Sequence, residues 1–123
     1  MADETDDELP RYLVEFTEPA LMEADAAYLN LSTQRGLDYA IRWYEGLFLA
    51  AQNLSTLPQC HAIAPENDTY GVEVRRLLYS GPSRRSSGRA YRILFYVVEP
   101  LEDEEEGTVR ILHVWHGTKG PAE

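Results

Sequence analysis

The chain has 123 residues, a formal net charge of −10 and one cysteine, Cys60. This length fits about one domain that buries an ordinary core, and a lone cysteine excludes an internal disulfide or a cysteine metal framework. The N-terminus is acidic where a signal peptide is basic, and no apolar run approaches the roughly 18 residues of a membrane span. We therefore expect a cytoplasmic protein with no membrane contact and no cofactor, whose single thiol is free and at least half-buried.

The negative charge is concentrated in two segments. Residues 1–10 carry five acids and no base, and residues 99–106 carry six acids and no base, so the remaining chain is +1. The first segment lacks aromatic residues and is typical of a disordered leader. The low pI therefore does not exclude a nucleic-acid partner for the folded body, although the long-range charge opposes it.

Two helices are predicted after a first strand. Alternation over 12–16 indicates the strand, and Thr17 then begins a helix as its cap and continues to near Gln34. Gly36 ends this helix or separates it from the next. The second helix starts at Leu37 and is the longest, about five turns. It is expected to cover the sheet with an apolar stripe of Leu37, Ala40, Ile41, Tyr44, Leu47, Phe48, Ala51 and Leu54. Trp43 lies off this stripe, so we expect it to be a second packing contact rather than a binding residue.

Three further strands follow the loop that begins at Pro58. They are expected over about 72–79, 90–98 and 108–115, with the acidic segment as the last turn, and their short connections make consecutive strands antiparallel neighbours. The predicted fold class is α+β: a strand, two helices and a three-stranded antiparallel meander, with the helices packed on one face of a single sheet. One domain is expected over 11–119, between the leader 1–10 and a tail over 120–123.

Arginines are concentrated in the first two strands of this meander and in the turn that connects them. Six arginines and no acid occur between positions 75 and 98, against the trend of an acidic chain; they are Arg75, Arg76, Arg84, Arg85, Arg89 and Arg92. Such a group is a candidate anion-binding surface, and nucleic acids are the commonest large polyanions. The alternative is a solvated hairpin edge that its charges keep soluble.

The histidines of the last strand do not form a metal pair. His113 and His116 are three residues apart, which places them on opposite faces of a strand. His116 lies where the strand runs into Gly117, so its imidazole is expected to be accessible for proton transfer near neutral pH, unless it merely terminates the strand. Arginines with a histidine suit binding and cleavage of a phosphodiester, whereas docking on a protein target needs less.

An ordered set of sequence segments resembles one known family. The segments are Thr-Glu-Pro-Ala at 17–20, Ala-Ile-Arg-Trp at 40–43, Val-Glu-Val-Arg-Arg-Leu-Leu at 72–78, Tyr-Arg-Ile-Leu-Phe-Tyr at 91–96 and Val-Arg-Ile-Leu-His-Val-Trp-His-Gly at 109–117. Together they are similar to the RelE/ParE toxin superfamily of bacterial type II toxin–antitoxin modules, often labelled plasmid stabilization proteins. The resemblance covers about residues 11–119.

The resemblance implies a small toxin held inactive by a cognate antitoxin, in a hetero-oligomer, with its active surface on the sheet. In the branch that cleaves mRNA on the ribosome (mRNA interferases, a class of endoribonuclease), the catalytic positions fall on Arg75, Arg92 and His116. The arginines would hold phosphate and stabilise the transition state, and the histidine would transfer a proton. Nucleic acid would further contact Arg76, Arg84, Arg85, Arg89 and Lys119.

Three alternatives accompany this reading of the resemblance. The chain would be an inhibitor of DNA gyrase, as in the ParE branch, or a non-catalytic relative whose sheet only binds an antitoxin. In addition, the acidic leader or the acidic turn at 99–106 would fold back on the arginines and mask them. The antitoxin itself would cover apolar surface while its acids meet the arginines between Arg75 and Arg92.

Overall fold

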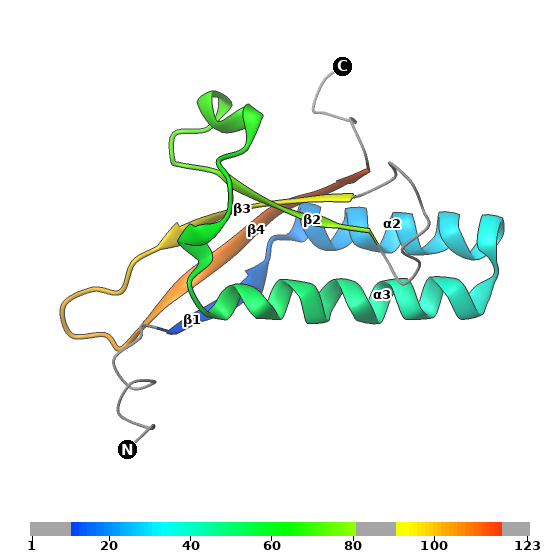
Figure 1. The fold of residues 1–123 in the computed structure, drawn as a ribbon, viewed down its shortest axis with the longest axis horizontal. Helices are drawn as coiled ribbons and strands as arrows, with labels where there is room; N and C mark the ends of the chain where they lie inside the picture. Colours follow the sequence, from blue (N-terminus) through cyan, green and yellow to red (C-terminus); the bar gives the residue numbers. More distant parts are fainter. Residues whose placement is uncertain (1–10, 81–90, 117–123) are drawn as a thin grey trace.

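The computed structural model describes residues 11–80 and 91–116, apart from the side chain of Glu66. In these residues two helices cover one face of a four-stranded sheet, and a loop with short 3₁₀ turns crosses the other face (Figure 1). The predicted α+β fold with its helices on one face of the sheet is confirmed. The elements in order are β1 (Arg11–Phe16), α2 (Glu18–Arg35), α3 (Leu37–Gln52), η1 (Asn53–Ser55), η2 (Pro58–Cys60), η3 (Pro65–Thr69), β2 (Arg75–Tyr79), β3 (Tyr91–Val98) and β4 (Glu106–His116).

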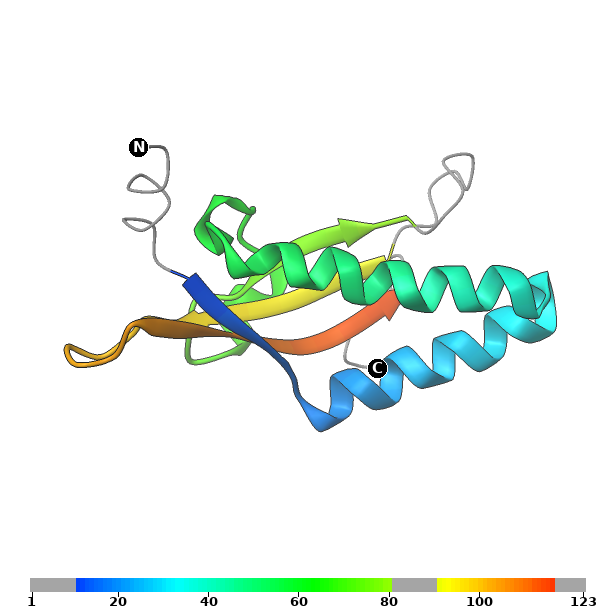
Figure 2. The ribbon, with the colours of Figure 1, turned by 90° about the horizontal axis from the view of Figure 1, so that it is seen from below.

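The sheet has the strand order β1-β4-β3-β2. Strands β2, β3 and β4 form the antiparallel meander predicted from the short connections. Strand β1 pairs with β4 in parallel, from Arg11 opposite Glu106 to Phe16 opposite Ile111. The α2–α3 hairpin carries the chain from β1 to β2 at the other edge of the sheet and covers the face of the sheet that is nearer to the viewer in Figure 2. The register between β3 and β4 shifts after Leu94, so Leu94 lies opposite His113 and Phe95 lies opposite Ile111.

Local signals fix the start of α2 and its separation from α3 where the sequence predicts them. The expectation that the second helix is the longest was wrong, because α3 ends at Gln52 with 16 residues and α2 has 18. The Thr17 hydroxyl accepts a hydrogen bond from the Ala20 amide at 3.3 Å and donates to the carbonyl of Ile111 at 2.9 Å, so this cap also ties α2 to β4. Gly36 separates the helices with φ at +96°, a conformation that side-chain-bearing residues rarely adopt. Neither helix in the described part of the chain has the length and apolar character of a membrane-spanning segment.

The main core differs from the predicted stripe of α3 in its largest member. Trp43 is 1% exposed and stacks at a tilt against Tyr91, with ring centroids 4.9 Å apart, whereas Leu37 of the predicted stripe is 57% exposed. The cause is the face that α3 turns to the sheet. Ala20 and Ala24 of α2 are small, and the indole belongs to the same core cluster as these two alanines. Trp43 is therefore a packing residue, as expected, but it belongs to the main core although it lies off the predicted stripe.

The loop between α3 and β2 makes a second, smaller core on the opposite face of the sheet. This core contains Ala64, Val74, Leu94 and Trp115. The Ala64 amide donates to the Val74 carbonyl at 2.8 Å, so residues 72–74 belong to this loop and β2 begins only at Arg75. Cys60 is exposed in the same connection, and the prediction of a buried or half-buried thiol was wrong.

Candidate functional site

Arg75 lies on the side of the sheet that faces the helices. It pairs with the core residue Phe95 across β2 and β3, and paired residues share a face. Its guanidinium donates to the His61 carbonyl at 2.6 Å and forms an ion pair with Glu73 at 2.9 Å. Through these bonds the Arg75 side chain, which is 18% exposed, holds the loop between α3 and β2 against β2.

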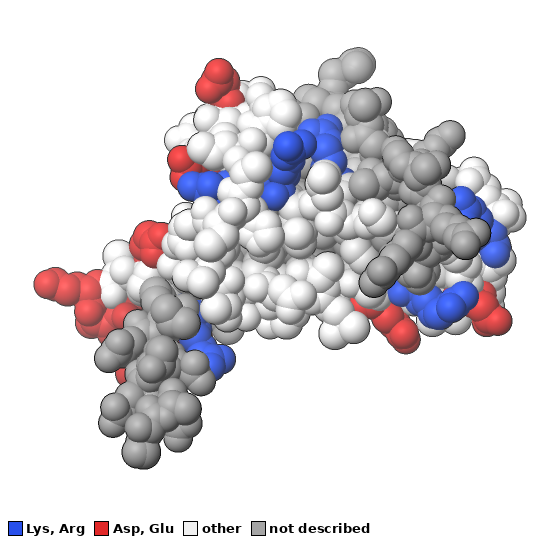
Figure 3. All heavy atoms as spheres, in the orientation of Figure 1, with Lys and Arg blue, Asp and Glu red and all other residues white. Residues whose placement is uncertain are grey.

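Arg92 lies on the opposite side, called here the open face. It is opposite Trp115 in the register, and its guanidinium carbon lies 5.8 Å from the centre of the Trp115 ring. Arg76 shares this face because it is opposite Leu94, two residues along β3 from Arg92. In Figure 3 basic side chains gather above β2, beside the η3 segment.

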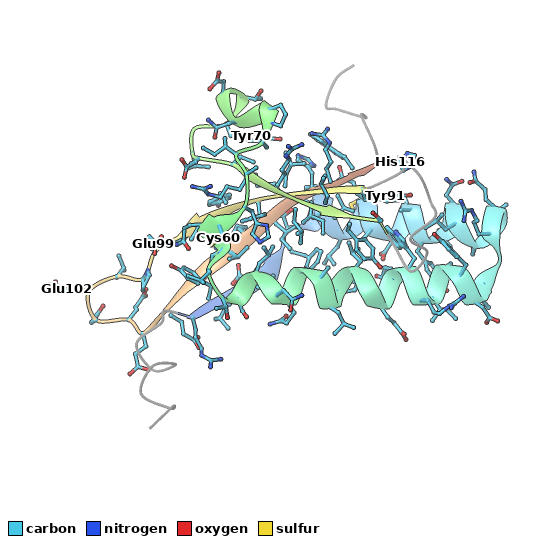
Figure 4. The ribbon with its side chains drawn as sticks, in the orientation of Figure 1. Cys60, Tyr70, Tyr91, Glu99, Glu102 and His116 are labelled. Atoms are coloured by element: carbon cyan, nitrogen blue, oxygen red, sulfur yellow. The ribbon has the colours of Figure 1, made fainter. Side chains whose placement is uncertain are left out.

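His116 lies on the helix side, at the end of the sheet. It pairs with Tyr91, and the two ring centroids are 4.7 Å apart (Figure 4). Arg75 is on the same side, but its partner Phe95 is four residues from Tyr91 along β3, a separation of roughly 13 Å. The structure therefore does not bring Arg75, Arg92 and His116 together, and the expectation of one site built from these three residues is corrected.

The remaining predicted contacts to nucleic acid are only partly described. Arg84, Arg85, Arg89 and Lys119 lie outside the described residues. The acidic turn does not mask the arginines of the open face, because it lies at the end of the sheet away from Tyr91 and His116 (Figure 4). Glu99 at its start accepts hydrogen bonds from the Tyr12 hydroxyl and the Gln59 amide, at 2.8 and 2.9 Å. The acidic leader also lies outside the described residues.

A contact that the sequence does not predict joins Glu23 of α2 to β4. Beyond Ile111, β4 has no β1 residue beside it, and the Glu23 carboxylate takes that place as the acceptor for the Val114 amide at 2.9 Å. The same carboxylate accepts from the Trp115 indole at 3.1 Å and contacts His113 Nδ1 at 3.0 Å. Because a carboxylate only accepts, Nδ1 is the nitrogen that donates in this contact.

This contact places an oriented imidazole on the open face. The His113 ring stacks on Trp115, with centroids 4.2 Å apart and planes at 23°, while Arg92 lies over the same indole. The His113 side chain is 24% exposed. A histidine and an arginine that contact the same indole on one face are residue types that serve proton transfer next to a phosphate. Nothing in the local sequence signals it, because Glu23 and His113 are 90 residues apart.

The part of the chain that the structure describes contains no set of side chains that could bind a metal ion. No group of three or more histidine, cysteine, aspartate or glutamate side chains is arranged there to hold an ion. His113 and His116 lie opposite Leu94 and Tyr91, on the two different faces that strand periodicity predicts.

The sequence and the structure were compared with those of known proteins, and only the structure comparison gives a match. No protein-family model matches the sequence, and no curated protein sequence matches it significantly. Among the solved structures, a chain of the "Chromosomal ParDE TA system from P. aeruginosa" matches with a TM-score of 0.58 and 16% sequence identity. The match covers 87% of this chain and 97% of that chain. The chain thus shares its fold with a member of a ParDE system along nearly the whole of both.

Proposed function

We propose that this protein is the toxin of a type II toxin–antitoxin module and that a cognate antitoxin holds it in a hetero-oligomer. The observation that carries the proposal is the fold match to a ParDE chain, which covers 87% of this chain. The helices also expose large apolar side chains, with Met22 and Leu29 at 63% and Leu49 at 70%. An amphipathic antitoxin segment would cover such a surface.

The toxin is proposed to act by binding its target, and DNA gyrase is the target that the ParE-like fold favours. The three residues expected to form a nuclease centre do not converge, and Arg75 is already held by His61 and Glu73. The net charge of −10 also opposes the long-range approach of RNA, although the chain outside residues 1–10 and 99–106 is +1. Inhibition by docking needs complementary surfaces and no catalytic group.

Ribosome-dependent mRNA cleavage is the second candidate, and one observation favours it. Glu23 orients His113 on the open face, where His113 and Arg92 both contact Trp115, so His113 would take the proton of a 2′-hydroxyl while Arg92 holds the phosphate. In that case His113, rather than His116, would be the base, because His116 is on the other side of the sheet.

Induced expression of the lone chain in bacteria separates the two candidates. Growth, transcript integrity and the DNA damage response would be followed for the wild type and for the Arg92→Ala, His113→Gln and His116→Gln variants. The proposal predicts growth arrest with DNA damage and intact transcripts, retained in His113→Gln. Cut transcripts that disappear in His113→Gln and Arg92→Ala but persist in His116→Gln would establish the nuclease instead. A soluble, folded chain that causes no arrest would contradict both.

A further inference from the structure

A cavity of about 730 Å³ lies between the helix hairpin and the end of the sheet that carries His116. This volume is typical of sites for small organic molecules, which occupy roughly 300–1,000 Å³. Residues of α2, α3, β3 and β4 line it, and Tyr91 and His116 mark its place in Figure 4. Most of its lining lies on the helix side, and it meets the open face only at Trp115 and at Glu23, which contact His113.

One part of the cavity wall is apolar. Ala27 and Leu31 of α2, Trp43 of α3 and Val114 of β4 contribute it. Leu31 is half-buried, and Trp43 and Val114 are buried, at 1% and 4% exposed. The apolar body of a ligand would lose its contact with water on this surface.

The other part of the wall presents hydrogen-bond donors. Arg35, Tyr39, Tyr91 and His116 contribute side chains, and the Arg35 guanidinium is held over the Tyr39 ring at 5.0 Å. Burial raises the pKa of Tyr91, which keeps its hydroxyl protonated and able to donate at neutral pH.

The wall also holds acceptors, but its one carboxylate is already used. Among the described lining residues, Asn30, Gln34 and Ser80 carry amide or hydroxyl oxygens, and the carboxylate of Glu23 accepts from His113, Val114 and Trp115. The buried indole N–H of Trp43 has no acceptor within the described part of the chain. This unpartnered donor favours a ligand that brings an acceptor, and the Arg35 guanidinium favours an anionic one.

We propose that this cavity binds a small carboxylic acid with a short apolar body. The carboxylate would accept from Arg35, His116 and the tyrosine hydroxyls, and the body would lie against Leu31 and Trp43. The site goes beyond the proposed toxin activity and does not depend on it. It assigns a ligand class to a surface that neither the resemblance nor the fold match addresses.

Two-dimensional NMR of the full chain would test the site, because both tryptophans of the sequence, Trp43 and Trp115, line the cavity. The ¹⁵N-labelled chain would be titrated with 3-phenylpropionate and, separately, with its neutral amide, 3-phenylpropionamide. We expect saturable shifts of the indole N–H signals by the acid, with a Kd on the order of 1 mM for a ligand of this size. The amide should bind about tenfold more weakly, since it lacks the charge-assisted bonds.

Two variants locate the carboxylate. Arg35→Gln should weaken binding of the acid about tenfold without changing binding of the amide. Arg42→Gln is the matched control, because Arg42 is exposed on α3 and does not line the cavity. Equal affinity for acid and amide, equal effects of the two arginine variants, or no saturable shift up to about 20 mM would overturn the proposal.

Discussion

Replacing Glu23 by alanine should be among the most costly changes of a partly exposed residue. The change removes the acceptor of the Val114 amide and the Trp115 indole, which belong to residues 4% and 5% exposed. An orphaned buried donor costs about 1–3 kcal/mol. Glu23 is itself 31% exposed, so water reaches the space it leaves, and the low end of that range applies to each donor. His113 can turn to water, so the expected loss is about 2 kcal/mol in the free energy of unfolding.

Urea unfolding followed by tryptophan fluorescence measures this loss, and thermal unfolding should show a Tm lower by about 8 °C. Glu23→Gln keeps one carbonyl acceptor and should lose about half as much. Glu45→Ala is the control, because Glu45 is an exposed acid of α3. A loss in Glu23→Ala no larger than that of Glu45→Ala would refute the idea that Glu23 closes the edge of β4.

Two further predictions concern Tyr79 and its neighbours. Gly46→Ala places a methyl group against the Tyr79 hydroxyl, which donates to the Trp43 carbonyl at 2.8 Å. It should therefore destabilise the fold by about 1–2 kcal/mol despite the better helix propensity of alanine. In a double-mutant cycle, Tyr79→Phe should relieve part of this cost. Additive effects of the two substitutions would argue against a steric overlap between the new methyl group and the Tyr79 hydroxyl. Burial raises the pKa of Tyr79 to about 12, and a hydrogen bond to Asp25 followed by burial raises that of Tyr44 to about 12. The ordinary pKa of a tyrosine is near 10, so the stability that these two tyrosines confer is complete below pH 10 and is lost as the pH rises toward 12. The urea midpoint should fall across this range, and it should fall more gently in Tyr79→Phe. An unchanged midpoint would contradict the raised pKa of these two tyrosines.

Most elements of the fold could be predicted because their signals are local. Thr17 and Gly36 begin and separate the helices where the sequence indicates, and the two-residue period of β3 correctly divides its side chains between two faces. The order of short connections also specifies the antiparallel meander. These features depend on neighbours in the sequence, which a periodic pattern records.

The features that could not be predicted depend on distant parts of the chain. Trp43 is buried because the face that α3 turns toward the sheet contains it together with Ala40, Leu47 and Ala51 of the stripe, while Leu37 and Ile41 of the stripe are exposed; a helical pattern does not specify that rotation. Arg75 and Arg92 fall on opposite faces through the pairing of β2 with β3, so their common charge gave a misleading picture of one site. The Glu23–His113 contact joins a helix to a strand across 90 residues.

A purified assay with both substrates present tests the proposed function most directly. The lone chain would be added to DNA gyrase with supercoiled plasmid, and in parallel to a translation extract with a labelled mRNA. A toxin that acts by binding gyrase should inhibit supercoiling or trap cleaved plasmid while the mRNA stays intact, and His113→Gln should behave like the wild type. Cleaved mRNA beside unaffected gyrase, with cleavage lost in His113→Gln, would contradict the account.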